Sequence, residues 1–227
     1  MKKICLLFLA CLFLCACSNT EDIAVSLDAV IDSELSNPTV YRQDQNTIFF
    51  SYYLPSDIYK LESHKDAAIF SFNNEEILMN MNITSIIASE EGSIKEEARN
   101  ESFYSDDRLV YSREGTYLNH DEIEVEFIYN IYAVNNKYLI SFKTDDMNYY
   151  AYVSRNSLEL LTKRLFMLAE SMSINSESVV AYYANVDMID YTREQVNLFE
   201  TVIPREGQLE EILIDKDLPS TTTPSEN

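Results

Sequence analysis

The sequence predicts an α+β domain in which a long helix packs on one face of an antiparallel β-sheet. Two segments of the chain indicate this fold most directly. Residues 122–133 alternate apolar and polar side chains, which is typical of a strand because successive side chains point to opposite faces of a sheet. Residues 158–172 instead repeat apolar side chains at three- and four-residue spacing, the period of a helix with one buried stripe. The strand set is Ile123, Val125, Phe127, Tyr129 and Ile131, and the helix set is Leu158, Leu161, Leu165, Leu168 and Met172. A sheet and a helix that each bury one face make a two-layer core.

The first strand is expected to continue into a hairpin and then into the helix. Asn135 and Asn136 follow the strand, and asparagine tolerates the positive φ that a tight hairpin turn requires. A second alternating run at 138–142 supplies the partner strand. The helix is expected to begin with Asn156 as its N-cap, and the Glu159 side chain should reach back to that cap.

Further elements are predicted before this core. Residues 47–54 are β-branched and aromatic and end at a proline turn signal, and residues 66–83 indicate two strands joined at 73–75. Gly115 is expected to mark a turn ahead of the central hairpin. Residues 23–31 predict a short amphipathic helix within an otherwise polar stretch.

After the long helix, the chain predicts a C-terminal addition of one helix and one strand. Residues 175–183 favour a short second helix, and residues 196–203 favour a strand closed by a proline. Residues 215–227 have no apolar period and are expected to be disordered.

The N-terminus has the features of a signal for export. Residues 1–16 hold two lysines followed by an apolar run that is too short for a membrane span, which needs about 20 residues. The run ends in Leu14-Cys15-Ala16-Cys17 before a polar stretch, and this resembles the lipobox of bacterial lipoproteins. The resemblance implies cleavage before Cys17, which then carries a diacylglyceryl group on its sulfur and often an acyl chain on its amine. A plain secretory signal and a short N-terminal anchor are the alternatives.

These features predict four parts of the chain. Residues 1–16 are a lipoprotein signal peptide, 17–46 a lipidated N-terminus and tether, 47–214 a single α+β domain, and 215–227 a disordered tail. The predicted location is the extracytoplasmic face of a bacterial membrane, held there by the lipid on Cys17.

The order of hairpins followed by a helix across the sheet, over about residues 47–174, resembles the PsbP/Mog1-like α/β fold. The similarity is carried by the strand at 139–142 and by the helix at 158–172. Known bacterial members include extracytoplasmic lipoproteins, and members generally bind partner proteins rather than catalyse. No functional residue is carried over from this resemblance, because fold alone does not define function.

Charge and cysteine content exclude several classes of protein. The chain has 17 basic and 38 acidic residues, a formal charge of −21 that repels nucleic acid and anionic lipid headgroups. All four cysteines lie in the first 17 residues, so the domain has no disulfide framework and no cysteine metal site. No cofactor motif is present, and we expect neither a cofactor nor a dedicated metal site.

The residues that catalysis would need are few. His64 and His120 are the only two histidines, and both lie in polar stretches that favour solvated loops over a catalytic or metal site. Glu122, Glu124 and Glu126 share one face of the central strand, where carboxylates can act as acid and base or bind calcium. A solvated sheet face is the simpler interpretation. We therefore expect a protein that is not an enzyme.

Tyrosine clusters are the remaining candidates for a site. Tyr149, Tyr150 and Tyr152 are interpreted as a loop surface beside the long helix, since tyrosine is frequent in binding hot spots. Packing of half of them into the core is the alternative. The sequence thus predicts a lipid-anchored, non-catalytic module that binds an envelope protein. The alternatives are a lipoprotein that binds a small ligand, a glycan or a cation, and, less favoured, a surface hydrolase without a known motif.

Overall fold

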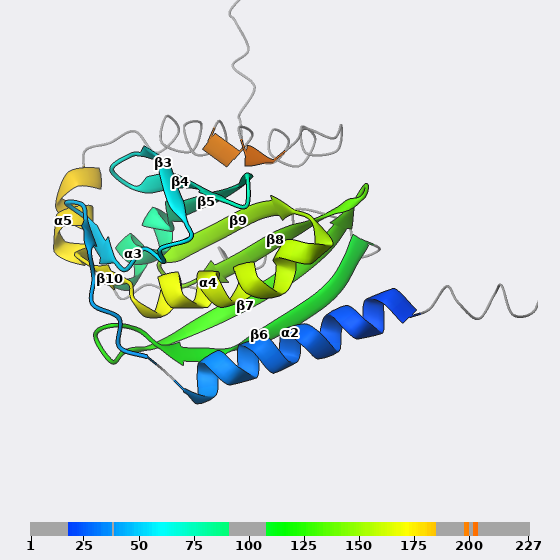
Figure 1. Cartoon of the computed structure of the whole chain (residues 1–227). Coiled ribbons are helices and arrows are strands. Elements are labelled where there is room, and N and C mark those ends of the chain that lie inside the picture. Colours follow the sequence, from blue (N-terminus) through cyan, green and yellow to red (C-terminus); the bar gives the residue numbers. More distant parts are fainter. Residues whose placement is uncertain (1–17, 38, 91–107, 185–197, 200–201, 204–227) are drawn as a thin grey trace, which may run out of the picture.

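The computed structural model describes residues 18–37, 39–90, 108–184, 198–199 and 202–203 (Figure 1). Its main feature is a seven-stranded sheet in the order β3-β4-β5-β9-β8-β7-β6, in which every neighbouring pair is antiparallel. The strands are β3 Tyr59–Ser63, β4 Ala67–Phe72, β5 Glu75–Met81, β6 Leu109–Leu118, β7 Glu124–Val134, β8 Lys137–Thr144 and β9 Met147–Val153. Two meanders, β3 to β5 and β6 to β9, are joined by the pairing of β5 with β9. The predicted α+β class is confirmed.

The helices gather mainly on one face of this sheet. Figure 1 shows α2 and α4 lying across the same face, with α2 over the β6 edge. The helical segments are α2 Ser18–Ser36, α3 Ile83–Glu90, a short 3-10 turn η2 Arg155–Ser157, α4 Leu158–Glu170 and α5 Ser176–Tyr183. A small second sheet pairs β2 Phe50–Tyr52 with β1 Gln45–Asn46 and with β10 Ser173–Ile174. None of the described helices is long and apolar enough to cross a membrane.

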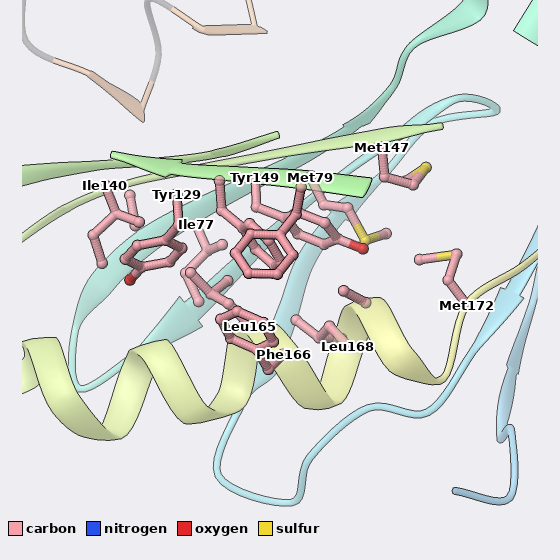
Figure 2. Close-up of a cluster of buried hydrophobic side chains, with 14 of the residues drawn as sticks. Ile77, Met79, Tyr129, Ile140, Met147, Tyr149, Leu165, Phe166, Leu168 and Met172 are labelled. Atoms are coloured by element: carbon pink, nitrogen blue, oxygen red, sulfur yellow. The ribbon is translucent and has the colours of Figure 1, made fainter. Parts of the chain in front are cut away.

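The layer between α4 and the sheet is the core that the sequence predicts. All five residues of the predicted helical stripe are buried, as are four of the five residues predicted on the inner side of β7. Figure 2 shows Leu165, Phe166 and Leu168 directed from α4 toward Ile77 and Tyr149 on the sheet. Phe166 stacks on Phe142, with ring centroids 4.8 Å apart.

Both predicted asparagine turns are present. Asn135 has a φ of 53° between β7 and β8, and Asn73 and Asn74 have φ values of 50° and 62° between β4 and β5. These values lie in the left-handed region, where asparagine is more easily accommodated than most side chains.

The start of β7 differs from the prediction. Ile123 is 59% exposed rather than buried, because the strand begins only at Glu124. Glu122 has a φ of 60°, and the Asn119 side chain accepts a hydrogen bond from the Ile123 backbone N–H at 2.9 Å. This turn interrupts the alternation one residue before the strand forms.

The start of α4 also differs. The predicted Asn156 N-cap is wrong, because the 3-10 turn η2 occupies residues 155–157 and the helix follows from Leu158. Ser157 stands at the N-cap position and makes no capping hydrogen bond with its side chain. Glu159 pairs instead with Arg155, with Oε1 and Nη1 3.3 Å apart.

Gly115 lies inside β6 and does not mark a turn. It pairs with Phe127 on β7, and a Cβ built on this glycine would approach the Phe127 ring to 3.0 Å. The missing side chain therefore leaves room for an aromatic ring of the neighbouring strand.

The N-terminal segment is not a tether over its described length. The amphipathic helix predicted at 23–31 is confirmed, but it extends over residues 18–36, and Ile23, Leu27 and Ile31 are buried in the main core. Ile23, Leu27 and Ile31, which lie within the predicted tether at 17–46, therefore pack with the α+β domain. The signal peptide, Cys17 and the predicted disordered tail lie outside the described residues.

The opposite face of the sheet is covered by part of the C-terminal addition. Phe199, Val202 and Ile203 pack on a second cluster of sheet residues. These sheet residues are Ile69, Leu78, Tyr132, Val134, Leu139 and Tyr150. The strand predicted at 196–203 is wrong where it is described, since residues 198, 199 and 202 are helical. The short helix predicted after residue 175 is confirmed as α5, and the Asn175 side chain caps it by accepting from the Ser178 N–H at 3.1 Å.

Candidate functional site

The three tyrosines predicted as a binding surface lie in β9 and not in a loop. Tyr149 is fully buried against α4, as Figure 2 shows, whereas Tyr150 is 5% exposed on the other face and contacts Phe199 edge-on at 5.1 Å. Tyr152 is half-buried and donates its hydroxyl to the Val134 carbonyl at 3.1 Å. The predicted tyrosine surface is therefore wrong, because strand alternation divides the three side chains between two covered faces.

Tyr149 has an unusual environment even for a buried tyrosine. Its hydroxyl has no hydrogen-bond partner among the described residues, and burial raises the pKa of this phenol far above its ordinary value. Tyr129, on the same face, instead shares a hydrogen bond of 2.7 Å with the Thr162 hydroxyl of α4. Both rings are buried in the core, so neither is available to a ligand at the surface.

The two histidines lie at opposite edges of the sheet. His64 follows β3, where its Nε2 is 3.5 Å from Glu62 Oε2, and His120 lies in the turn after β6. Six strand spacings of about 4.8 Å separate the two edge strands, which are therefore roughly 29 Å apart across the sheet. Histidines that follow strands so far apart are not arranged to act on one substrate atom.

The glutamate face of β7 matches the simpler prediction. Glu124 and Glu126 are exposed, and they alternate with the buried Val125 and Phe127. Glu122 belongs to the preceding turn rather than to the strand.

A polar cluster that the sequence did not predict lies between α2 and α4. Glu34 of α2 and Glu170, the last residue of α4, are only 7% and 5% exposed. Lys163 extends from α4 to Glu34, with Nζ and Oε1 3.1 Å apart. The sequence places Lys163 beside Glu159 on an exposed helix face, and only the docking of α2 supplies its buried partner.

Glu170 has no such partner. Neither an ion pair nor a hydrogen bond reaches its carboxyl from the part of the chain that the structure describes. Burial, followed by the charge of Glu34, raises the pKa of Glu170 to about 8. The carboxyl is therefore mostly protonated near neutral pH.

A cavity of about 130 Å³ adjoins Glu170. It lies where the C-terminal ends of α2 and α4 meet the end of β6. Its lining residues are Leu35, Thr116, Tyr117, Leu118, Glu124 and Glu170. The cavity thus combines one buried carboxyl, one exposed carboxylate, a hydroxyl and three largely apolar side chains.

Polar contacts hold α2 against β6 near this cavity. Arg113 of β6 pairs with Asp28 at 3.2 Å and also with Asp32, and the Tyr111 hydroxyl donates to Asp28 at 2.7 Å. These contacts, together with the buried apolar side of α2, fix the helix that forms one wall of the cavity.

Within the described ranges, no three His, Cys, Asp or Glu side chains are grouped so that they could hold a metal ion. Comparison of the chain with known proteins found no matching family model, no matching curated protein and no matching solved structure.

Proposed function

We propose that this chain is a lipid-anchored extracytoplasmic lipoprotein whose single α+β domain is a non-catalytic module that binds an envelope protein. The observation that carries the proposal is the position of α2, which begins at Ser18, one residue after the lipobox cysteine. Ile23, six residues beyond Cys17, is already part of the domain core. At 1.5 Å per helical residue, about 9 Å of chain separates the lipidated residue from the folded domain.

This short separation restricts where the domain can act. Two or three acyl chains on Cys17 give stable anchoring, whereas one chain is marginal. A domain held so near the bilayer reaches only partners within the membrane-proximal layer of the envelope. The separation thus favours a partner in or beside the membrane over one that is free in solution.

Replacing Cys17 by alanine tests the anchor. The variant should leave the membrane fraction or remain unprocessed, as judged by fractionation and by the mass of the purified chain. Replacing Cys15 by alanine is the matched control and should leave the protein processed and membrane-bound. Processed, membrane-bound Cys17→Ala protein would contradict the proposed anchor.

The surface proposed for the partner is the edge strand β3. Among the described strands it pairs only with β4, and all five of its residues are exposed. Tyr59 and Leu61 are 68% and 52% exposed. An open strand edge with apolar side chains can pair with an extended segment of another protein through backbone hydrogen bonds. The acidic net charge favours a basic segment.

A photo-crosslinking residue at Leu61 tests this surface in intact cells. It should give one discrete adduct, which the additional change Tyr59→Ser weakens without lowering the melting temperature. The same crosslinker at Val40, which is 81% exposed elsewhere, is the control. Identical adducts from the two positions, or none from Leu61, would exclude β3 as the partner surface.

The non-catalytic role and the finer fold assignment belong to the same proposal. The separation of His64 and His120 across the sheet supports binding over acid–base chemistry. The antiparallel sheet crossed by α4 supports the PsbP/Mog1-like fold. The cavity beside Glu170 favours a second role, the binding of a small molecule.

A further inference from the structure

We propose that the cavity between α2, α4 and β6 binds a small organic ammonium ion, with the carboxylate of Glu170 as its counter-ion. The site needs neither the lipid anchor nor the β3 partner, so it goes beyond the proposed function. The argument starts from Glu170, which is 5% exposed, lines the cavity and has no hydrogen bond or ion pair to any residue that the structure describes.

Burial removes part of the hydration of the Glu170 carboxyl, and this penalises its charged form because no described residue pairs with it. Glu34 shows the alternative, because Lys163 neutralises it at 3.1 Å. Lys163 is therefore already paired with Glu34. Of the two buried glutamates, Glu170 is the one that no described cation neutralises. A cation in the cavity supplies the interaction that the described residues do not.

The other walls indicate what kind of cation fits. Leu35 and Leu118 offer apolar surface, and Tyr117 offers an aromatic ring, which attracts alkylated ammonium groups through its face. Only two carboxyl groups line the cavity, and no three His, Cys, Asp or Glu side chains of the described residues are grouped so that they could hold a metal ion. An anion would meet Glu124 at the same cavity. The formal charge of −21 also draws cations toward the protein.

The volume limits the ligand. A cavity of about 130 Å³ holds several water molecules but lies below the range of about 300–1,000 Å³ that is typical of drug-sized ligands. The ligand is therefore an amine of a few non-hydrogen atoms, with its alkyl part against the leucines and its nitrogen at Glu170.

Binding should release a proton. In the empty site Glu170 is protonated near pH 7, because burial and Glu34 raise its pKa to about 8. A bound ammonium ion favours the carboxylate, so the Glu170 proton passes to the solvent and no covalent bond forms. The titratable groups around Glu170 are Glu34 on α2, Lys163 on α4, Tyr117 on β6, Glu124 on β7 and Tyr41 before β1. Glu170 is the group that changes charge in the expected step.

Titration of the purified full chain with methylammonium and tetramethylammonium chloride tests the proposal. Calorimetry should show saturable binding of at least one probe in a background of potassium chloride, and a pH-stat at pH 7 should record up to one proton released per bound ion. Affinity should rise with pH and level off above about 8. Absence of saturable heat with both probes would overturn the proposal.

Two variants and one control assign the site. Glu170→Gln keeps the size of the side chain and should weaken binding about tenfold or more, the loss expected for one charge-assisted hydrogen bond, and should abolish proton release. Leu118→Trp fills the cavity from a half-exposed position and should weaken binding while Glu170 remains. Glu114→Gln, at an exposed position of the same strand, should bind as the parent does. Equal affinity in the parent and in both cavity variants would refute the site.

Discussion

Replacing Leu27 by alanine tests whether α2 is part of the folded domain or a tether. Leu27 lies on the side of α2 that packs on the core, and it is fully buried there together with Ile23 and Ile31. If α2 is docked, the substitution leaves a cavity where the leucine side chain was. If α2 is a solvated tether, the substitution removes no buried contact.

The structure sets the expected magnitude. Removing a buried leucine side chain costs about 3–5 kcal/mol, from the lost transfer free energy and from the cavity left behind. Leucine and alanine have similar helix propensities, so little of this cost is local to the helix. For a domain of this size, a loss of ~3 kcal/mol lowers the melting temperature by about 6–12 °C.

Urea unfolding followed by far-UV circular dichroism measures the effect. Val25→Ala is the matched control, because Val25 is 70% exposed on the same helix and its replacement should be neutral or slightly stabilising. If both variants unfold at the parent's midpoint, α2 is not docked, and the cavity beside Glu170 loses one of its walls.

Three further outcomes follow from the buried polar groups and the β6 glycine. Because the folded-state pKa of Glu170, about 8, lies above its ordinary value of 4.5, its contribution to stability is complete below pH 4.5 and is lost as pH rises toward 8. The parent should lose up to about 1.4 kcal/mol per pH unit in this window relative to Glu170→Gln, and parallel curves of unfolding free energy against pH would contradict the raised pKa. Tyr129→Phe should cost about 0.5–1.5 kcal/mol by breaking a hydrogen bond, whereas Tyr149→Phe should be neutral or stabilising because its hydroxyl has no described partner, and equal losses in chemical denaturation would refute this difference. Gly115→Ala should destabilise the domain by about 1–3 kcal/mol in the same assay because its new methyl group meets the Phe127 ring, and an unchanged midpoint would mean that this ring moves freely.

The sequence determined the local structure of this protein wherever one face of an element is polar. The alternation in β7 and the leucine stripe of α4 identified their buried sides, because a half-solvated element carries its own period. The asparagine turns were equally local, since backbone conformation at one or two residues defines them.

β9 shows where this reasoning fails. A strand covered on both faces has no polar side, so Tyr149 and Tyr150 carry no alternation that distinguishes a core strand from an aromatic loop. The cover on the second face comes from Phe199, Val202 and Ile203, in a segment that has the composition of a strand but is helical at residues 198, 199 and 202. Tertiary packing overrides local propensity there.

The candidate site depended on tertiary structure entirely. The period of Ile23, Leu27 and Ile31 predicted a helix with one apolar side, but an apolar stripe does not specify the surface that will cover it. The docking of α2 on α4 and β6 brings Glu34 to Lys163 and leaves Glu170 buried, with no ion pair or hydrogen bond to the residues that the structure describes. Residues so distant in the chain meet only through the sheet order and the helix packing, and the raised pKa of Glu170 arises from that meeting.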